Sequence, residues 1–179
     1  LGGQGAPLVP LGDKLLFNEY EAALNLGGFS NITLLKNEIF IASDICPINI
    51  LLNKYANKYG FAFDKEGAIG RVGKINIELL NKFAEIEAFS KFPRHSLSRE
   101  WIEMQYIPLI DSAKCTIPNI MRTLYEHICI EIAKILEMYH ISNVIVTGGG
   151  AYNNFLIELL KEKTSTKIII PENSIIEYK

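Results

Sequence analysis

The stretch AALNLGGFSNITLL, residues 22–35, decides how the chain folds. It contains two apolar runs, 22–26 and 32–35, separated by a glycine pair, which predicts two β-strands joined by a tight turn. Glycines in such a turn can adopt positive φ and leave their N–H groups uncovered for an oxyanion. The candidate phosphate ligands in this turn and the strand after it are Gly27, Gly28, Asn31 and Thr33. The alternative is a turn with a purely structural role.

A matching element lies far down the chain, in NVIVTGGGAYN, residues 143–153. Four residues typical of a buried strand lead into three glycines, and a helix is expected over 153–163. Bare backbone at the junction of a strand, a glycine loop and a helix N-terminus can lie flat against a nucleotide. The alternative is a tight strand-to-helix crossover, which rarely needs three consecutive glycines. The candidate nucleotide ligands here are Gly148, Gly149 and Gly150.

The segments between these two elements predict further strands and helices. A third strand is expected over 38–42 and a last one over 167–170, and helical periodicity marks 48–59, 76–84 and 118–139. The order of three strands and a helix, then helix, strand, helix and strand, predicts an α/β fold. Its expected form is a ribonuclease-H-like lobe, a mixed sheet with flanking helices.

Several single positions in these segments carry their own expectations. Pro47 suits a first helical turn, and Gly60 suits the end of that helix. Asp44 is either the cap of this helix or a polar group facing the cleft. In the long helix after Pro118, an apolar stripe predicts the buried side. Its solvent-facing side is expected at Glu126, Glu131, Lys134 and Glu137.

Composition and charge exclude several classes of protein. The 179 residues carry a formal net charge of -2 with no run of like charges, so no nucleic-acid partner is expected. No 18-residue apolar stretch and no signal peptide is found, which predicts a cytoplasmic protein without a membrane partner. The three cysteines are widely spaced and form no CxxC motif, so neither a disulfide framework nor a metal site is expected.

Three motifs together resemble the anhydro-N-acetylmuramic acid kinase family. They are GGQGAPLVP (residues 2–10), NxGGxxNIT (25–33) and VTGGGAYN (146–153), and the similarity runs over the whole chain. The family belongs to the superfamily of sugar kinases, actin and heat-shock chaperone ATPases, in which two ribonuclease-H-like lobes hold ATP between them. The resemblance implies an enzyme, a phosphotransferase that uses ATP and Mg²⁺. Its reaction opens the 1,6-anhydro ring of an amino sugar and phosphorylates the 6-hydroxyl, in cell-wall recycling.

The resemblance also implies site residues. Asn153 would lie near the ribose of ATP, and Gln4 would lie in a loop that lines the cleft. DICPIN at 44–49 is similar to the family's DTGPGN. Asp44, Pro47 and Asn49 match, whereas Ile45 departs and Cys46 and Ile48 replace glycines. The loop FPRHSLSRE at 92–100 is similar to a family loop near the sugar. Its matching residues are Ser96, Arg99 and Glu100.

The rest of that loop leaves two roles open. Ser98 stands where the family has a glycine, and it can instead cap a helix whose first turn holds Glu100. His95 follows Arg94, and nothing in the sequence places it beside a nucleophile. A surface or substrate-contact role is therefore expected for His95.

The chain opens inside a motif, at Leu1 without a methionine, and stops just after a strand-like segment. We therefore expect residues 1–179 to be a single C-terminal lobe of a two-lobe kinase, truncated at both ends. Residues 61–117 are expected to form a helical insertion that faces the substrate. By resemblance, the catalytic Asp precedes Leu1, so no catalytic residue is expected in this chain and the isolated chain should be inactive.

Two other interpretations stay open at this point. One is a non-catalytic nucleotide-binding module of the actin or chaperone type, and the other is a degenerate relative that kept the fold. The GGQGAP loop favours the kinase, because an actin-like module has no reason to match a sugar-kinase cleft. Family members resemble dimers, which leaves a homodimer open.

Overall fold

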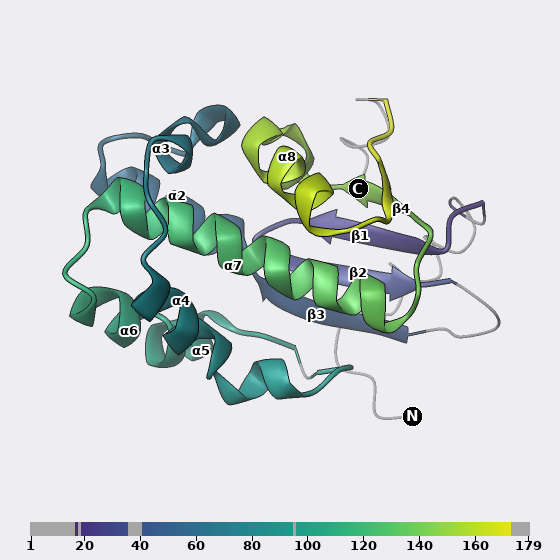
Figure 1. Ribbon diagram of the computed structural model, residues 1–179, viewed down its shortest axis with the longest axis horizontal. Helices are drawn as coiled ribbons and strands as arrows, with labels where there is room; N and C mark the ends of the chain where they lie inside the picture. The colour runs from purple at the N-terminus through teal and green to yellow at the C-terminus, as the bar shows by residue number, and fades with distance from the viewer. Residues whose placement is uncertain (1–16, 18, 36–40, 95, 173–179) are drawn as a thin grey trace.

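A mixed β-sheet forms the centre of the computed structural model, which describes residues 17, 19–35, 41–94 and 96–172 (Figure 1). The order across the sheet is β3-β2-β1-β4-β5, antiparallel from β3 to β1 and parallel from β1 to β5. The strands are β1 (Ala22–Leu26), β2 (Phe29–Leu34), β3 (Ile41–Pro47), β4 (Asn143–Thr147) and β5 (Lys167–Ile169). This is the predicted ribonuclease-H-like sheet.

Helices pack around this sheet and at one end of it. The α-helices are α2 (Asn49–Lys58), α3 (Ala68–Arg71), α4 (Ile77–Ala84), α5 (Arg99–Gln105), α6 (Ile107–Ser112), α7 (Ile117–Met138) and α8 (Asn154–Lys163). Short 3₁₀ turns are η1 (Lys65–Gly67), η2 (Glu87–Ser90) and η3 (Gly149–Tyr152). Helices α3 to α6 lie within the predicted insertion, 61–117, and whether it faces a substrate stays a prediction. Among the described residues no helix combines the length and apolarity needed to cross a lipid bilayer.

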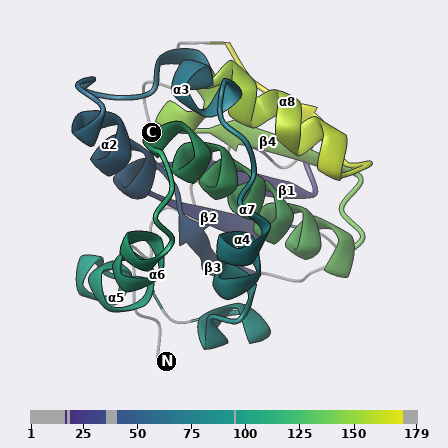
Figure 2. The same ribbon diagram turned by 60° about the vertical axis from the view of Figure 1, so that its left-hand side comes forward.

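Helix α7 runs across one face of the sheet, with α8 on one side of it and α4 on the other (Figures 1 and 2). Its predicted apolar stripe is buried and packs with the strand residues that point to the same face. That face holds Leu24, Ile32, Leu34, Val144 and Val146, all at most 1% exposed. Strand alternation gives the opposite face a separate small cluster of Phe17, Ala23 and Ile145.

Local signals in the sequence set most element ends. Gly60 has φ of +95° directly after α2 and its cap, as predicted for a helix-terminating glycine. Asn76 and Ser98 accept hydrogen bonds from the backbone N–H groups of Leu79 and Trp101, so each caps its helix. Ser98 therefore has the capping role that the sequence left open.

Two expectations are wrong, one near the start of α2 and one along α7. Pro47 is the last residue of β3, not part of a helical turn. Asp44 lies within β3, which excludes the helix cap and leaves the other role that the sequence kept open. Glu126 and Glu131 are buried, not solvent-facing. Both carboxylates are paired with cations, because a charge that loses water needs a partner: Glu131 binds Lys134, at 2.6 Å, and Glu126 binds Arg122 and Lys163.

The ion pair of Glu126 with Lys163 links α7 to α8, and replacing Glu126 tests its contribution to stability. Burial acts to raise the pKa of Glu126, but hydrogen bonds from Lys163 and Arg122 outweigh it and the pKa is lowered. The Glu126→Gln variant is expected to lose about 1–2 kcal/mol of unfolding free energy at pH 7, because the acceptor of both hydrogen bonds loses its negative charge while Arg122 and Lys163 stay charged. Urea denaturation measures this loss.

The same variant has an expected pH dependence. Because the folded pKa of Glu126 is below the usual 4.5, the unfolded chain binds more protons below that pH. The contribution of Glu126 is present above about pH 4.5 and is lost as the pH falls further, so wild type and variant should converge by pH 3. Glu162→Gln, at an exposed position of α8, is the control. A constant difference from pH 7 to pH 3 would contradict the ion-pair explanation.

Candidate nucleotide-binding site

The two glycine turns lie side by side. Strands β1 and β4 are parallel neighbours with Asn25 opposite Thr147. The turns that follow the two strands therefore lie at the same end of the sheet. A Cβ atom added to Gly148 would lie 2.2 Å from Asn25 Oδ1, and one added to Gly150 would lie 2.6 Å from Leu26 Cβ. The turns are therefore in direct contact.

The glycines of the two turns differ in their surroundings. Gly148 has φ of +80°, and both Gly148 and Gly150 press against β1, so no side chain fits at either position. In contrast, no atom lies within 4 Å of a Cβ built on Gly28, and for Gly149 the nearest is Asn49 Nδ2 at 3.9 Å. Gly28 and Gly149 thus leave open backbone where a ligand can approach, whereas Gly148 and Gly150 bring the two turns together.

The start of α2 holds the first turn in place. The Gly28 carbonyl oxygen accepts hydrogen bonds from the N–H groups of Ile48, at 2.9 Å, and Ile50, at 3.3 Å. The N–H of Asn49 donates to the Gly27 oxygen at 3.3 Å, and its Nδ2 donates to the Leu26 oxygen at 3.1 Å. These bonds satisfy the turn's carbonyl groups inside the protein, so their negative partial charge does not oppose an approaching anion.

A row of polar residues crosses four strands on the sheet face away from α7. Register places Asp44 opposite Asn31, Asn31 opposite Asn25, and Asn25 opposite Thr147. Directly opposite residues share a face, so these four side chains form one line. Asn25 Oδ1 and Thr147 Oγ1 are buried without a hydrogen-bond partner among the described residues, which is unusual for polar atoms. The unsatisfied atoms therefore lie at the ends of the two strands that lead into the glycine turns.

Thr33, another predicted phosphate ligand, lies two residues further along β2 from the turns than Asn31 does. It is opposite Ala23 on the same face and is 3% exposed. Its burial argues against direct contact with a ligand in this arrangement. Asn31 is half-buried and is the better-placed of the two.

The predicted substrate residues lie next to β3. The Asp44 carboxylate accepts a hydrogen bond from the N–H of Leu97 at 2.8 Å, and Ser43 Oγ accepts one from the N–H of Arg94 at 2.9 Å. These bonds bring Ser96 close to Asp44, while Arg99 and Glu100 are exposed in the first turn of α5. Gln4 and His95 lie outside the described residues.

The electrostatics of this region are set by burial and by Arg94. Burial raises the pKa of Asp44, although the Leu97 N–H and the Arg94 guanidinium act in the opposite direction. The guanidinium lies 4.9 Å from the centre of the Phe89 ring and donates to the Ile45 carbonyl oxygen. Arg94 is therefore held within the protein.

The two residues that stand where the family has glycines do not obstruct the approach of a ligand to the glycine turns. Cys46 and Ile48 are both 0% exposed, with their side chains in the core under α7. Burial raises the pKa of the Cys46 thiol to about 12, which rules out a thiolate nucleophile at neutral pH.

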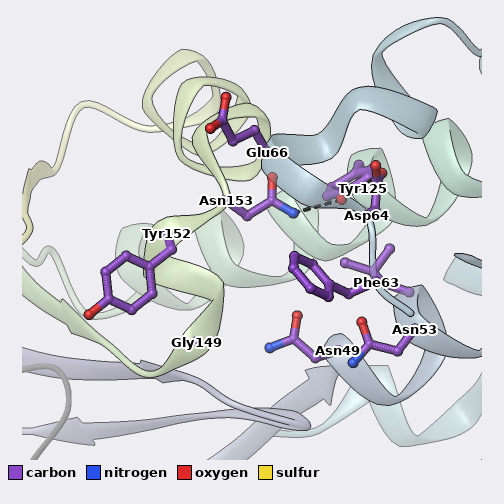
Figure 3. A pocket seen from close by; sticks show the side chains of 10 residues that line it. Asn49, Asn53, Phe63, Asp64, Glu66, Tyr125, Gly149, Tyr152 and Asn153 are labelled. Carbon is purple, nitrogen blue, oxygen red and sulfur yellow. Dashed lines mark hydrogen bonds between the residues drawn. The ribbon is translucent and has the colours of Figure 1, made fainter. Parts of the chain in front are cut away.

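A pocket of about 210 Å³ opens beside Gly149 (Figure 3). Its walls come from α2, η3, Tyr125 of α7 and the segment between α2 and α3. Asn49 and Asn53 lie one helical turn apart below the ring of Phe63, and Asn153 lies above it. The pocket thus begins at an open glycine and continues between amide and aromatic side chains, which suits a nucleoside.

A chain of hydrogen bonds fixes the wall of this pocket. Asn153 Oδ1 caps α8 by accepting from the N–H of Leu156 at 3.2 Å, and its Nδ2 donates to the Tyr125 hydroxyl at 2.7 Å. That hydroxyl in turn donates to the buried Asp64 carboxylate at 3.0 Å. Asn153 is thus a helix cap whose orientation is fixed, and the predicted ribose contact would use its remaining hydrogen-bonding capacity.

Sequence reasoning missed part of this site. Asn25 and Thr147 interrupt two apolar strands with polar side chains, a signal that was present in the sequence. Asn49 and Asn53 are spaced four residues apart on the polar side of a predicted helix, which also could have identified them. Phe63 carried no signal, because its place beside the pocket depends on tertiary structure.

Metal binding was not expected from the side chains. Among the residues that the structure describes, no three His, Cys, Asp or Glu side chains come together in a way that could hold a metal ion.

Solved structures share this fold. The activator of 2-hydroxyisocaproyl-CoA dehydratase from Clostridium difficile, with bound ADPNP, aligns with a TM-score of 0.56 and 16% identity, over 91% of this chain and 58% of that one. Component A of (R)-2-hydroxyglutaryl-CoA dehydratase from Acidaminococcus fermentans aligns with the same score and identity, over 94% and 61%. At this level of identity the likeness shows the fold alone.

Sequence comparison identifies the family. Anhydro-N-acetylmuramic acid kinase of Sulfurimonas denitrificans is 36% identical over 91% of this chain and 48% of that protein. The enzyme of the same name from Aliivibrio fischeri is 35% identical over 90% and 46%. The chain thus spans about half the length of these curated relatives. The model of the anhydro-N-acetylmuramic acid kinase family matches residues 1–174, and the chain belongs to that family.

Proposed function

We propose that this chain is one lobe of an ATP-dependent sugar kinase. At its full natural length, the protein would convert 1,6-anhydro-N-acetylmuramic acid and ATP to N-acetylmuramic acid 6-phosphate and ADP. The observation that carries the proposal is the direct contact of the two glycine turns at the mouth of the pocket. Family membership supports the choice of substrate.

In this proposal the phosphates lie over the first turn and the nucleoside enters the pocket. Gly28 supplies open backbone to the β- and γ-phosphates, with Gly27 and Asn31 beside it. Gly149 lies against the adenosine, between the flanking Gly148 and Gly150. Mg²⁺, when bound together with the nucleotide, would supply charge neutralisation for the phosphates.

The polar row then leads from the phosphates to the sugar side. It ends at Asp44, which we propose contacts the sugar together with the loop of Ser96, Arg99 and Glu100. In the reaction, water adds to the anomeric carbon, the bond from that carbon to O6 breaks, and O6 takes the γ-phosphoryl group. The base that removes the proton from water is the family's Asp, which we place outside these 179 residues.

A second candidate is a nucleotide-binding module that has lost sugar turnover. One observation favours it: Asp44 and Arg94 both form hydrogen bonds within this protein instead of facing a ligand. Asp44 accepts from the N–H of Leu97, and Arg94 donates to the Ile45 carbonyl oxygen. Thermal shift of the full-length protein separates the candidates. Stabilisation by both MgATP and the anhydro sugar supports the kinase. Stabilisation by MgATP alone supports the nucleotide-binding module. If neither ligand stabilises the protein, both candidates are wrong.

A coupled ADP-release assay with the anhydro sugar tests the kinase directly. The protein at its full natural length is expected to be active, and the 179-residue chain alone is expected to be inactive because the base and the other half of the cleft are outside it. Turnover by the chain alone would contradict the placement of the base. An inactive full-length protein would contradict the kinase.

Gly28→Ala tests the phosphate contact in the same assay. A methyl group there meets no protein atom, so the thermal midpoint should not change. It would occupy the space over the turn, and we expect kcat/KM for ATP to fall about 100-fold because backbone donors to the transferring phosphoryl group are displaced. Unchanged kinetics in a normally folded variant would exclude Gly28 from the phosphate site.

A further inference from the structure

Two phenylalanines of equal exposure stand close together between α2 and α3. Phe61 is 57% exposed and Phe63 is 58% exposed, far more than a large apolar side chain usually is. Phe61 lies beside Tyr59, with 6.2 Å between ring centres, and does not line the pocket. Phe63 does line it, and its ring lies between Asn153 and the pair Asn49 and Asn53 (Figure 3).

The backbone on both sides of Phe63 is fixed. On one side, Asn57 Nδ2 donates to two backbone carbonyl oxygens, that of Ala62 at 2.9 Å and that of Asn53 at 2.7 Å. On the other side, the Asp64 carboxylate accepts from the N–H groups of Ile69, at 2.7 Å, and Gly70, at 3.1 Å, and from Tyr125. Asp64 is 5% exposed, so this second anchor lies inside the protein.

An exposed aromatic ring on fixed backbone suits a flat ligand. Leaving the ring in water forgoes the free energy that burial would bring, and the two anchors prevent it from turning into the core. A ligand that stacks on the ring recovers this free energy without the cost of ordering a loop. Among parts of a nucleotide, only the base has a flat π face.

Asn53 adds a group that can distinguish one base from another. It is exposed, lines the pocket one helical turn after Asn49, and its side-chain amide has no hydrogen bond to another described residue. An amide offers one donor and one acceptor side by side, which matches the acceptor nitrogen and amino group of adenine. On its Watson–Crick edge, guanine carries two neighbouring donors, N1–H and the 2-amino group, which a carboxylate fits better.

We propose that Phe63 and Asn53 form the base subsite of the pocket, in which Phe63 stacks on the base and Asn53 selects adenine over guanine. This inference rests on the proposed nucleotide-binding function and goes beyond it by naming the groups that read the base. Phe63 supplies affinity for any base, because stacking depends little on base identity. Asn53 supplies the discrimination.

Phe63→Ala tests the stacking role in the protein at its full natural length. Calorimetry with MgATP, MgGTP and magnesium tripolyphosphate separates the base from the phosphates. The variant should bind both nucleotides about 10- to 100-fold more weakly, with tripolyphosphate affinity unchanged. Phe61→Ala, with the same change in side chain and exposure, should behave like wild type, and Phe63→Trp should keep ATP affinity.

Asn53→Asp tests the selection role. The ratio of ATP to GTP affinity should fall at least about tenfold, since a carboxylate accepts from the N1–H and 2-amino donors of guanine but has no donor for the acceptor nitrogen of adenine. Asn81→Asp, which makes the same charge change at an exposed position of α4, should leave the ratio unchanged.

The outcomes separate this inference from the proposed function. If wild type binds tripolyphosphate and ATP alike, or if both Phe63→Ala and Asn53→Asp leave nucleotide affinities unchanged, the base subsite is wrong while the phosphate site stands. If wild type binds none of the three probes, the proposed function and this inference are both overturned. Thermal midpoints equal to wild type show that the exposed substitutions leave the fold intact.

Discussion

The Gly148→Ala variant is expected to lose about 3–5 kcal/mol of unfolding free energy, enough to leave a marginally stable chain partly unfolded. Two costs combine at this position. Its φ of +80° is strained for any residue with a Cβ atom, and that atom would lie 2.2 Å from Asn25 Oδ1 and 3.0 Å from the Leu26 carbonyl carbon. Relief requires the buried end of the Asn25 side chain to turn away and the backbone at Leu26 to shift, both at the centre of the sheet. Urea denaturation followed by circular dichroism measures the loss.

Gly28→Ala is the matched control for this experiment. It introduces the same methyl group in the neighbouring turn, where no atom lies within 4 Å, and should change stability by less than about 0.5 kcal/mol. The pair therefore separates a glycine needed for folding from one needed for ligand approach. Equal destabilisation by the two substitutions, or a fully stable Gly148→Ala, would contradict the packing of the two turns.

Elements with strong local signals could be predicted from the sequence. The long apolar stripe of α7, the glycine after α2 and the strand-turn pattern of β1 and β2 need only periodicity and turn chemistry. The helix over 153–163 was equally clear, and Asn153 caps it. These features are local, so the chain determines them before tertiary contacts form.

The errors arose where tertiary structure overrides local preference. Glu126 and Glu131 have the polarity of a solvent-facing side, yet α8 and the sheet cover them and cations from Lys163 and Lys134 make their burial tolerable. Pro47 reads as a helix start, but the end of a strand at the edge of the sheet accommodates its missing N–H equally well. Pattern alone cannot distinguish these environments.

The candidate site was predicted only in part for the same reason. The glycine turns are visible as motifs, but the polar row depends on strand register. A register shift between Ser30 and Asn31 places Asp44, not Ile45, opposite Asn31. Without that shift Asp44 would point to the core. Such a shift cannot be read from residue types, so Asn25 and Thr147 could not be aligned with Asp44 in advance.

The buried histidine of α7 provides the second large effect. His127 is 2% exposed, and its Nε2 lies 2.8 Å from the Tyr106 hydroxyl, between the rings of Phe83 and Phe89. Burial lowers the pKa of His127 from the usual 6.5 to about 3, and the positive charges of Lys134 and Arg94 act in the same direction. The folded protein therefore keeps this imidazole neutral.

Stability should consequently fall as the pH drops from 6.5. In that range the unfolded chain gains a proton at His127 that the folded protein does not, so stability rises with pH by up to 1.36 kcal/mol per unit. Between pH 6.5 and pH 5, above the titration of ordinary carboxylates, we expect a loss of about 1.5–2 kcal/mol from this residue. Urea denaturation at pH 7, 6 and 5 measures the slope.

His127→Gln should remove this slope while keeping a partner for the Tyr106 hydroxyl, because glutamine has no titratable proton. The variant should cost about 1–2 kcal/mol at pH 7 through lost packing among the aromatic rings, and its stability should then change little down to pH 5. His140→Gln, at an exposed position after α7, should keep the wild-type slope. If His127→Gln keeps the slope as well, the slope comes from another group, and the explanation by a buried neutral His127 is wrong. The two variants therefore decide whether this core is held closed by a neutral histidine.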